Sequence, residues 1–268
     1  MLKRQTRLLN LYAIGFLFFL YGPLLLILLF SFNDSLYVAF PLKGVTFKWY
    51  RGLLDYPGLL SALRNTVTVA IPVSLCCTAL GLLTARALTR YEFPGKRPIF
   101  GLILLPLVIP YIILGIALLT TVRKTFDLPL SLWTVGASHL LVCLPFSVMV
   151  LLSRFEGFDR SFEEASLDLG ESGWMTFWRV TFPLVLPGVI SSLLLSFTAS
   201  FDEFLLAFFL SGDGPTLPIY IWSQLRFPQK LPGVLALGSC ILAFSISLIV
   251  IAEWFRRKGN AHGQSSVI

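Results

Sequence analysis

RFEGFDRSFEEASLDLGESGWMTFWRVTFP, residues 154–183, is a polar segment of about 30 residues between two strongly apolar stretches. Its pattern of caps and stops predicts two short helices joined by a tight turn. An isolated helix of about eight residues is marginal in water, so a hairpin of this kind needs something to pack against. Because the flanking stretches are apolar enough for lipid, we expect this hairpin to lie outside the membrane and to bind a partner protein.

The ends of the two short helices are predicted from single residues. The run from Ser161 to Glu164 matches a capping box, in which the serine hydroxyl and the glutamate bond the first turn. A first helix is therefore expected over 162–169, and Gly170 is a natural left-handed stop. Ser172 should cap a second helix over 174–179, and Pro183 should mark a break after it.

Six stretches outside this segment are apolar enough to cross a membrane, which takes about 20 mostly apolar residues. They lie near 10–32, 64–87, 99–121, 133–152, 184–210 and 233–255. Of the 268 residues, 56% are hydrophobic and 13% charged, whereas a soluble domain carries about 25% charged residues. Mean hydropathy is +0.81. The chain is therefore expected to be an all-α, polytopic membrane protein, with one transmembrane domain over 1–268.

The basic residues predict how these spans are oriented. The first apolar run is longer than the 7–15 residues of a signal-peptide core, so we expect a retained span whose start is held in the cytoplasm by Lys3, Arg4 and Arg7. Thirteen of the 21 basic residues fall on the side of the two termini: Lys3, Arg4, Arg7, Arg86, Arg90, Lys96, Arg97, Arg154, Arg160, Arg179, Arg256, Arg257 and Lys258. The positive-inside rule therefore predicts that both termini and segment 154–183 are cytoplasmic.

Few side chains of this chain suit metal or redox chemistry. The four cysteines lie in apolar runs without the paired spacing of a zinc or redox motif: Cys76, Cys77, Cys143 and Cys240. The two histidines, His139 and His262, are too far apart for a metal site. His139 is expected to be a packed helix residue, with a proton relay as the alternative. We expect no catalytic residue, metal or cofactor, and no nucleic-acid partner, because the positive charges sit at helix ends.

The hairpin segment resembles a known signature. Glu164-Ala165-Ser166, three residues, Gly170, nine residues and Val180-Thr181-Phe182-Pro183 follow the EAA motif of binding-protein-dependent ABC importer permeases. That motif is Glu-Ala-Ala, three residues, Gly, nine residues and Ile-x-Leu-Pro. Ser166, Val180 and Phe182 are small departures, and the spacing is intact. The resemblance implies a type I importer permease fold, in which segment 154–183 is the coupling hairpin.

Other segments resemble the spermidine/putrescine-type subfamily: Ser31-Phe32-Asn33-Asp34, Lys48-Trp49-Tyr50, Asn65-Thr66, Arg90-Tyr91 and Ser200-Phe201-Asp202-Glu203. In that family the loop docks on a dimer of ATP-binding subunits, which places Glu164, Ala165 and Gly170 at the ATPase contact. The resemblance further implies a second homologous permease, a periplasmic solute-binding protein and a bacterial inner-membrane location. The chain has no phosphate loop of its own, so it is expected not to hydrolyse ATP.

Asp202 and Glu203 are the acids that the hydropathy pattern places inside a span. Asp202 lies roughly 22 Å along the fifth span from Pro187, and an intramembrane acid is a functional-site hypothesis. Carboxylates beside aromatic rings such as Phe201 suit a cationic cargo. The alternative is a helix break that leaves both acids at the outer interface or paired with Arg226. Two further aromatic residues are expected along the path, Tyr111 and Trp222.

The cargo and the transport class leave alternatives. A polyamine or related cation fits the acids and the resemblance. Some polyamine permeases, however, carry an acid near the position of Tyr111, which this chain lacks. Opine, phosphonate and ferric-ion permeases share the same framework. An ion-gradient-driven transporter would have repeated halves and acids in several spans, and a membrane scaffold would have no use for Asp202 and Glu203.

Overall fold

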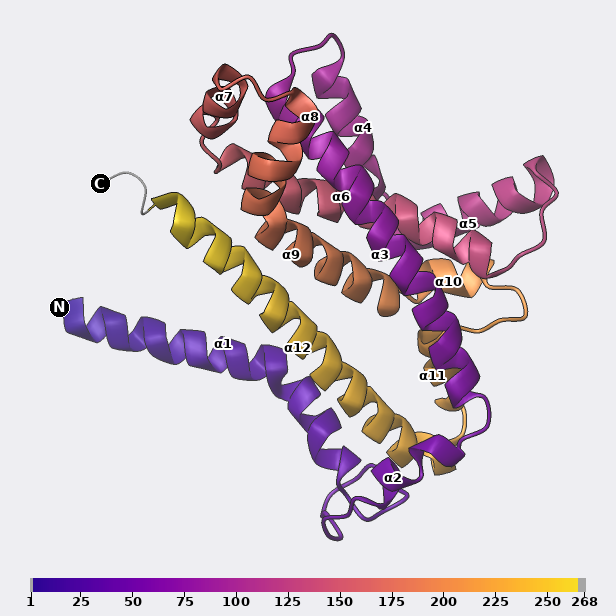
Figure 1. Ribbon diagram of the computed structural model, residues 1–268. Coiled ribbons are helices and arrows are strands. Elements are labelled where there is room, and N and C mark those ends of the chain that lie inside the picture. Colours follow the sequence, from indigo (N-terminus) through magenta and orange to yellow (C-terminus); the bar gives the residue numbers. More distant parts are fainter. Residues whose placement is uncertain (1, 265–268) are drawn as a thin grey trace. The chain divides into compact units, whose positions relative to one another are not determined.

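A computed structural model describes the backbone from Leu2 to Gln264 and the side chains from Leu9 to Arg257. The side chains of Lys3, Arg4, Arg7, Lys258 and His262 lie outside this range. The helices (Figure 1) are α1 Leu2–Ser31, α2 Lys48–Arg51, α3 Leu59–Arg90, α4 Lys96–Val108, α5 Tyr111–Thr120, α6 Leu132–Glu156, α7 Ser161–Asp168, α8 Gly173–Thr176, α9 Phe182–Phe201, α10 Leu205–Leu210, α11 Leu217–Gln224 and α12 Leu231–Gln264. The predicted all-α class is confirmed.

Within the described chain, five helices are long and apolar enough to cross a membrane: Leu9–Ser31, Leu59–Arg90, Leu132–Glu156, Gly173–Phe201 and Pro228–Arg257. The pair Lys96–Val108 and Tyr111–Thr125 passes the same test together but is bent by 102°, and counting it as one span gives six. Each of these lies on one of the six stretches expected from hydropathy.

The 102° bend has a local cause at Pro110. A proline ring clashes with a helical residue before it and pushes that residue into an extended conformation. Ile109 is accordingly extended, with φ −81° and ψ 128°, and α5 begins directly after the proline. The third expected span therefore contains a sharp break next to Tyr111.

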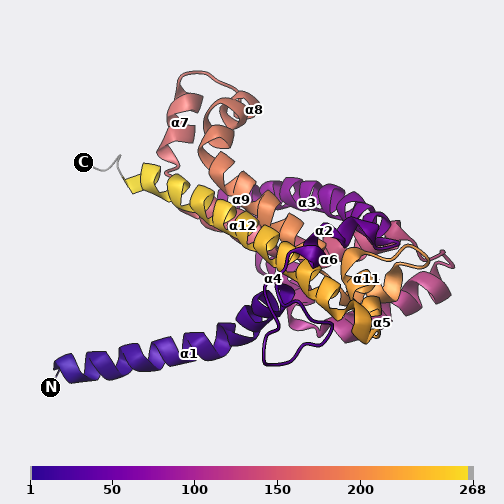
Figure 2. The same cartoon turned by 90° about the horizontal axis from the view of Figure 1, so that it is seen from below.

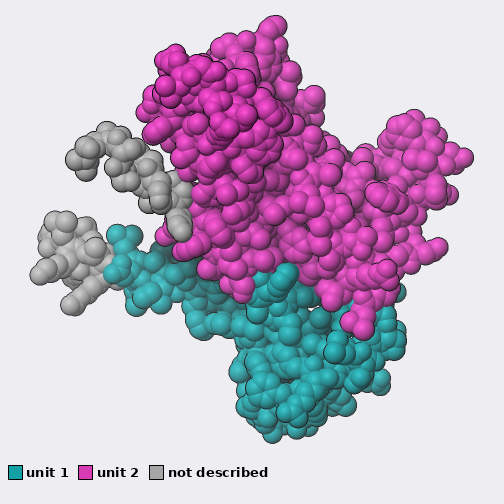
Figure 3. Space-filling view, viewed as in Figure 1, with its two compact units in different colours: residues 1–59, 221–244 teal, residues 60–220, 245–268 magenta. Residues whose placement is uncertain are grey.

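The chain divides into two compact units, coloured separately in Figure 3. Unit 1 comprises residues 1–59 and 221–244, and unit 2 comprises residues 60–220 and 245–268.

In unit 1, a short hydrogen-bonded chain ties together segments that are distant in sequence. The hydroxyl of Tyr50 lies 2.6 Å from Ser31 Oγ and 2.8 Å from Ser239 Oγ. The indole N–H of Trp49 donates to the carbonyl of Asn33 at 2.9 Å. These bonds give buried polar groups their partners and hold α2 against the last residue of α1 and the third turn of α12.

In unit 2, α6 packs along α9, and α3 approaches α6 closely. A Cβ added at Gly81 would overlap the Oγ of Ser147, so only glycine allows this approach. Ala85, one turn later, is fully buried, so Gly81 and Ala85 form one small-residue face on α3. Ser147 Oγ donates to the carbonyl of Cys77 at 2.8 Å and lies 2.6 Å from Ser192 Oγ, so one buried hydroxyl links α3, α6 and α9.

Candidate functional site

The segment 154–183 forms the expected hairpin, which projects from the α8 end of α9 in Figures 1 and 2. Gly170 turns the chain with φ +88°, the left-handed conformation predicted for it. Ser172 Oγ accepts the N–H of Met175 at 3.3 Å, so its capping role is confirmed too. Ser166 Oγ lies 3.0 Å from Thr176 Oγ1, and both side chains are buried. The serine that departs from the motif thus fastens the two arms.

Two predictions about this segment are wrong. Ser161 and Glu164 form no capping box, because α7 begins at Ser161 itself and its N-cap residue, Arg160, makes no side-chain capping bond. Instead, the backbone N–H of Ser161 donates to Asp159 Oδ1 at 2.9 Å, and this bond holds the pKa of the Asp159 carboxyl below its usual range. Pro183 causes no break, because a proline is tolerated in the first turn of a helix. A π-helical turn at Phe177–Thr181 carries α8 directly into α9.

The three residues expected at the ATPase contact lie on the hairpin's outer surface. Glu164 and Ala165 are exposed, and Gly170 forms the tip of the turn. The carboxylate of Glu164 is 62% exposed and lies 3.3 Å from Arg160 Nε. Two large apolar side chains of the hairpin are exposed as well: Leu169 is 86% exposed and Trp174 is 68% exposed. An apolar patch with a charged rim of this kind suits a protein contact.

Sequence reasoning overlooked Glu163, the neighbour of the motif glutamate. Its carboxylate lies 2.6 Å from Arg90 Nε, at the end of α3, and each side chain is 12% exposed. Its other oxygen accepts the hydroxyl of Thr181 at 2.6 Å. Adjacent helical residues point about 100° apart, so one of two consecutive acids can face inward while the other faces water. The sequence contains that signal but does not identify Arg90 as the partner.

The second part of the candidate site is a break in the fifth span. α9 ends at Phe201, and α10 begins at Leu205. Asp202 is exposed at this break, and one of its carboxylate oxygens accepts the hydroxyl of Ser245 from α12 at 3.0 Å. Among the described residues of unit 2, no basic side chain forms an ion pair with Asp202. A break of this kind inside a span is tolerated where it lines a cavity or is buried in protein.

Glu203, expected beside Asp202 on the path, is instead buried. Its side chain is 6% exposed. Its two oxygens accept the N–H groups of Leu205 at 3.1 Å, Leu206 at 2.9 Å and Ala207 at 3.2 Å. These are the free donors at the start of α10, so the geometry supports a capping role for Glu203.

The other expected path residues lie in different surroundings. Phe201 is buried and stacks on Phe197, with ring centroids 5.7 Å apart. Tyr111 packs against the buried cluster that includes Leu206. Leu206 is the second residue of α10, which follows the break after α9. Trp222 belongs to unit 1, where the guanidinium of Arg226 lies 4.5 Å from its ring centroid.

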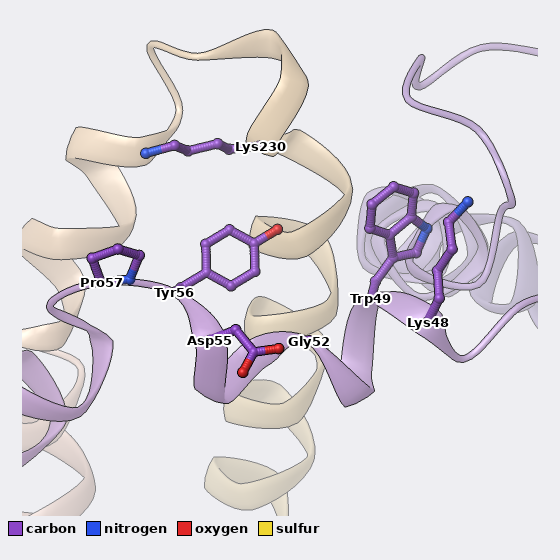
Figure 4. Close-up of a pocket in the computed structure, with 7 residues that line it drawn as sticks. All are labelled: Lys48, Trp49, Gly52, Asp55, Tyr56, Pro57 and Lys230. Carbon is purple, nitrogen blue, oxygen red and sulfur yellow. The ribbon is translucent and has the colours of Figure 1, made fainter.

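Unit 1 also contains an open pocket of about 460 Å³. Figure 4 shows its lining residues: Lys48, Trp49, Gly52, Asp55, Tyr56, Pro57 and Lys230. Tyr56 reaches so close to α12 that a Cβ at Gly233 would overlap its hydroxyl. Within the described residues, no three His, Cys, Asp or Glu side chains are arranged to hold a metal ion.

Residues 78–259 match the family described as binding-protein-dependent transport system inner membrane component. The chain is 33% identical over 243 residues to the spermidine/putrescine transport system permease protein PotC of Haemophilus influenzae, covering 90% of this chain and 93% of that protein. It is 32% identical over 244 residues to the putrescine transport system permease protein PotI of Escherichia coli, covering 88% and 86%. Its fold is similar to a chain in the crystal structure of the bacterial alginate ABC transporter in complex with alginate pentasaccharide-bound periplasmic protein, with TM-score 0.71, 16% identity and coverage of 96% and 94%.

Proposed function

The chain belongs to the family of binding-protein-dependent transport system inner membrane components, and we propose that it is the permease subunit of an ATP-driven polyamine importer. It is a multi-pass membrane protein and a transport subunit rather than an enzyme. Two curated relatives carry polyamine transport in their names. The observation in the structure that favours a cationic cargo is the exposed carboxylate of Asp202 at the break after α9.

The surroundings of Asp202 favour a positive charge. The C-terminal end of a helix carries a partial negative charge, and Asp202 adds a full one at the end of α9. A cation would neutralise both, as at the broken helices of other transporters. Phe208, an exposed residue of α10, offers a ring face for an ammonium group. A phosphonate would be repelled here, while a ferric ion or an opine is the competing cargo.

The hairpin is proposed to dock on a dimer of ATP-binding subunits. Glu164, Ala165 and Gly170 lie on its exposed surface, next to Leu169 and Trp174. Burial of large apolar side chains against a partner would remove their exposed area from water, about 25 cal/mol per Å². This contact requires the hairpin to be cytoplasmic, with both termini on the same side.

A second, homologous permease is proposed to pack on this chain inside the membrane. An apolar groove of about 460 Å³ runs between α3 and α6, where Gly136 and Ala137 leave room for a neighbouring helix. Trp133 at its edge is 87% exposed. A periplasmic solute-binding protein would deliver cargo on the opposite side of the membrane from the hairpin. The assignment of residues 1–268 to one permease domain stays a prediction.

Transport by the reconstituted complex tests this function. The chain, its second permease and the ATP-binding subunits are placed in liposomes, with the solute-binding protein outside and ATP inside. We expect uptake of radiolabelled spermidine that requires both ATP and the binding protein, with putrescine competing better than an opine, a phosphonate or ferric citrate. Uptake that runs on an ion gradient without ATP would refute the importer, and efficient competition by ferric citrate alone would refute the polyamine cargo.

A further inference from the structure

Glu163 joins three structural elements through one carboxylate. It belongs to α7, it pairs with Arg90 at the last residue of α3, and it accepts the hydroxyl of Thr181 just before α9. Arg90 is also held by aromatic rings, since its guanidinium lies 5.7 Å from the Phe155 centroid and 5.4 Å from the Phe158 centroid. The hairpin is therefore fastened at this carboxylate to the ends of α3, α6 and α9.

Two of these elements lead directly to the break at Asp202. The helix from Gly173 to Phe201 is continuous through the π-helical turn, so the second arm of the hairpin and the residue before Asp202 share one rod. α3 reaches the other side of the break. Val73 and Cys77 of this helix belong to the same buried cluster as Leu206, which directly follows the break.

We propose that Arg90 and Glu163 are positioning residues that transmit displacement of the hairpin to the helix break at Asp202. The inference rests on the proposed function, because it takes the hairpin as the surface on which the ATP-binding subunits act. With the pair intact, α7 moves together with α3 and α9. Without it, the Ser166–Thr176 and Thr181–Glu163 hydrogen bonds still hold α7 to the helix that continues into α9. The ion pair with α3 is lost, so movement of α7 no longer reaches the α3 side of the break.

Burial explains why this pair, rather than another ion pair of the hairpin, would have this role. The side chains of Arg90 and Glu163 are each 12% exposed, and losing one partner leaves an uncompensated charge. The Arg179–Glu171 pair of the same hairpin is 63% and 34% exposed, and exposed pairs contribute little. A lysine in place of Arg90 could neutralise Glu163, but it could not reproduce the stacking of the guanidinium on the rings of Phe155 and Phe158.

The test compares solute imported per ATP hydrolysed in the complete reconstituted transporter. Arg90→Ala and Glu163→Gln should lower this ratio about tenfold, a typical size for a coupling between sites, while the ATP-binding subunits still co-purify. The double variant Arg90→Glu/Glu163→Arg should recover most of the ratio, and Arg90→Lys should lie between. The matched control Arg179→Ala should change it less than about twofold.

The possible results distinguish the positioning role of the Arg90–Glu163 pair from the docking role of the hairpin surface. An unchanged ratio in Arg90→Ala, with the ATP-binding subunits bound, would overturn the positioning role and leave the docking proposal intact. Loss of bound ATP-binding subunits in step with uptake would also overturn it, since the pair would then merely keep the hairpin folded. If the wild-type chain itself binds no ATP-binding subunit, the proposed function is refuted, whatever the variants of Arg90 and Glu163 do.

Discussion

The Nε2 atom of His139 lies 3.3 Å from the Oε2 atom of Glu203, and both side chains are almost completely buried. His139 is also held through Nδ1, 2.9 Å from the hydroxyl of Ser200. The histidine is therefore packed and bonded, as expected for a lone histidine in a span. Together these contacts hold Glu203 against the start of α10, directly after the break that exposes Asp202.

Glu203→Ala should destabilise the protein by about 1–3 kcal/mol, because the N–H groups of Leu205, Leu206 and Ala207, two of them in buried bonds, would lose their acceptor. The apparent melting temperature in detergent should fall by several degrees, whereas Glu203→Gln should lose less, since its amide oxygen still accepts. If Glu203→Ala melts like the wild type but no longer transports, Glu203 acts on the cargo path and its capping role is secondary.

Asp202→Asn should weaken uptake of spermidine about tenfold, mainly through a higher KM, because an amide cannot neutralise an ammonium group. The apparent melting temperature should hardly change, since Asp202 is exposed and its carboxylate accepts one hydrogen bond, from Ser245. Asp213→Asn, at another exposed acid of unit 2, is the matched control. Equal KM values for the Asp202 variant and the control would favour the outer-interface alternative.

Glu164→Lys should reduce co-purification of the ATP-binding subunits by about tenfold and lower uptake in proportion. The change reverses a charge on the exposed surface that is proposed to dock, and like charges across an interface are costly. Folding should be unaffected, since the Glu164–Arg160 pair is more than half exposed. Glu92→Lys, at another exposed carboxylate of unit 2, controls for charge alone. Normal co-purification and uptake in Glu164→Lys would count against docking at this surface.

Gly81→Ala should destabilise the protein by about 1–3 kcal/mol, because the new methyl group would overlap Ser147 where α3 meets α6. Gly101→Ala is the control. No atom lies within 4 Å of a Cβ built at Gly101, and alanine favours helix, so this change should be neutral or stabilising. Thermal unfolding of the two variants in the same detergent compares them directly. Equal stability would mean that α3 and α6 do not need this close approach.

Local patterns in the sequence predicted much of this protein. Some features could be predicted because the residues that determine them are close in sequence. These features are the six apolar stretches, the left-handed stop at Gly170 and the cap at Ser172. The motif around Glu164 likewise lies within one segment, and its resemblance to the EAA motif implied a permease hairpin. The two local predictions that proved wrong, the capping box and the break at Pro183, concern helix ends, where a neighbouring acid or a π-helical turn supplies an equally good alternative.

Tertiary structure decided which of the two residues faces inward in each pair of consecutive acids. In sequence, Glu163 and Glu164 are adjacent acids, as are Asp202 and Glu203. In the fold, Glu163 reaches Arg90 and Glu203 reaches His139 and the start of α10, which leaves Glu164 and Asp202 exposed. A buried carboxylate needs partners from elements far apart in the chain, and no local pattern specifies them. The sequence thus placed the hairpin, whereas packing decided that Glu163 fastens it and Glu164 faces outward.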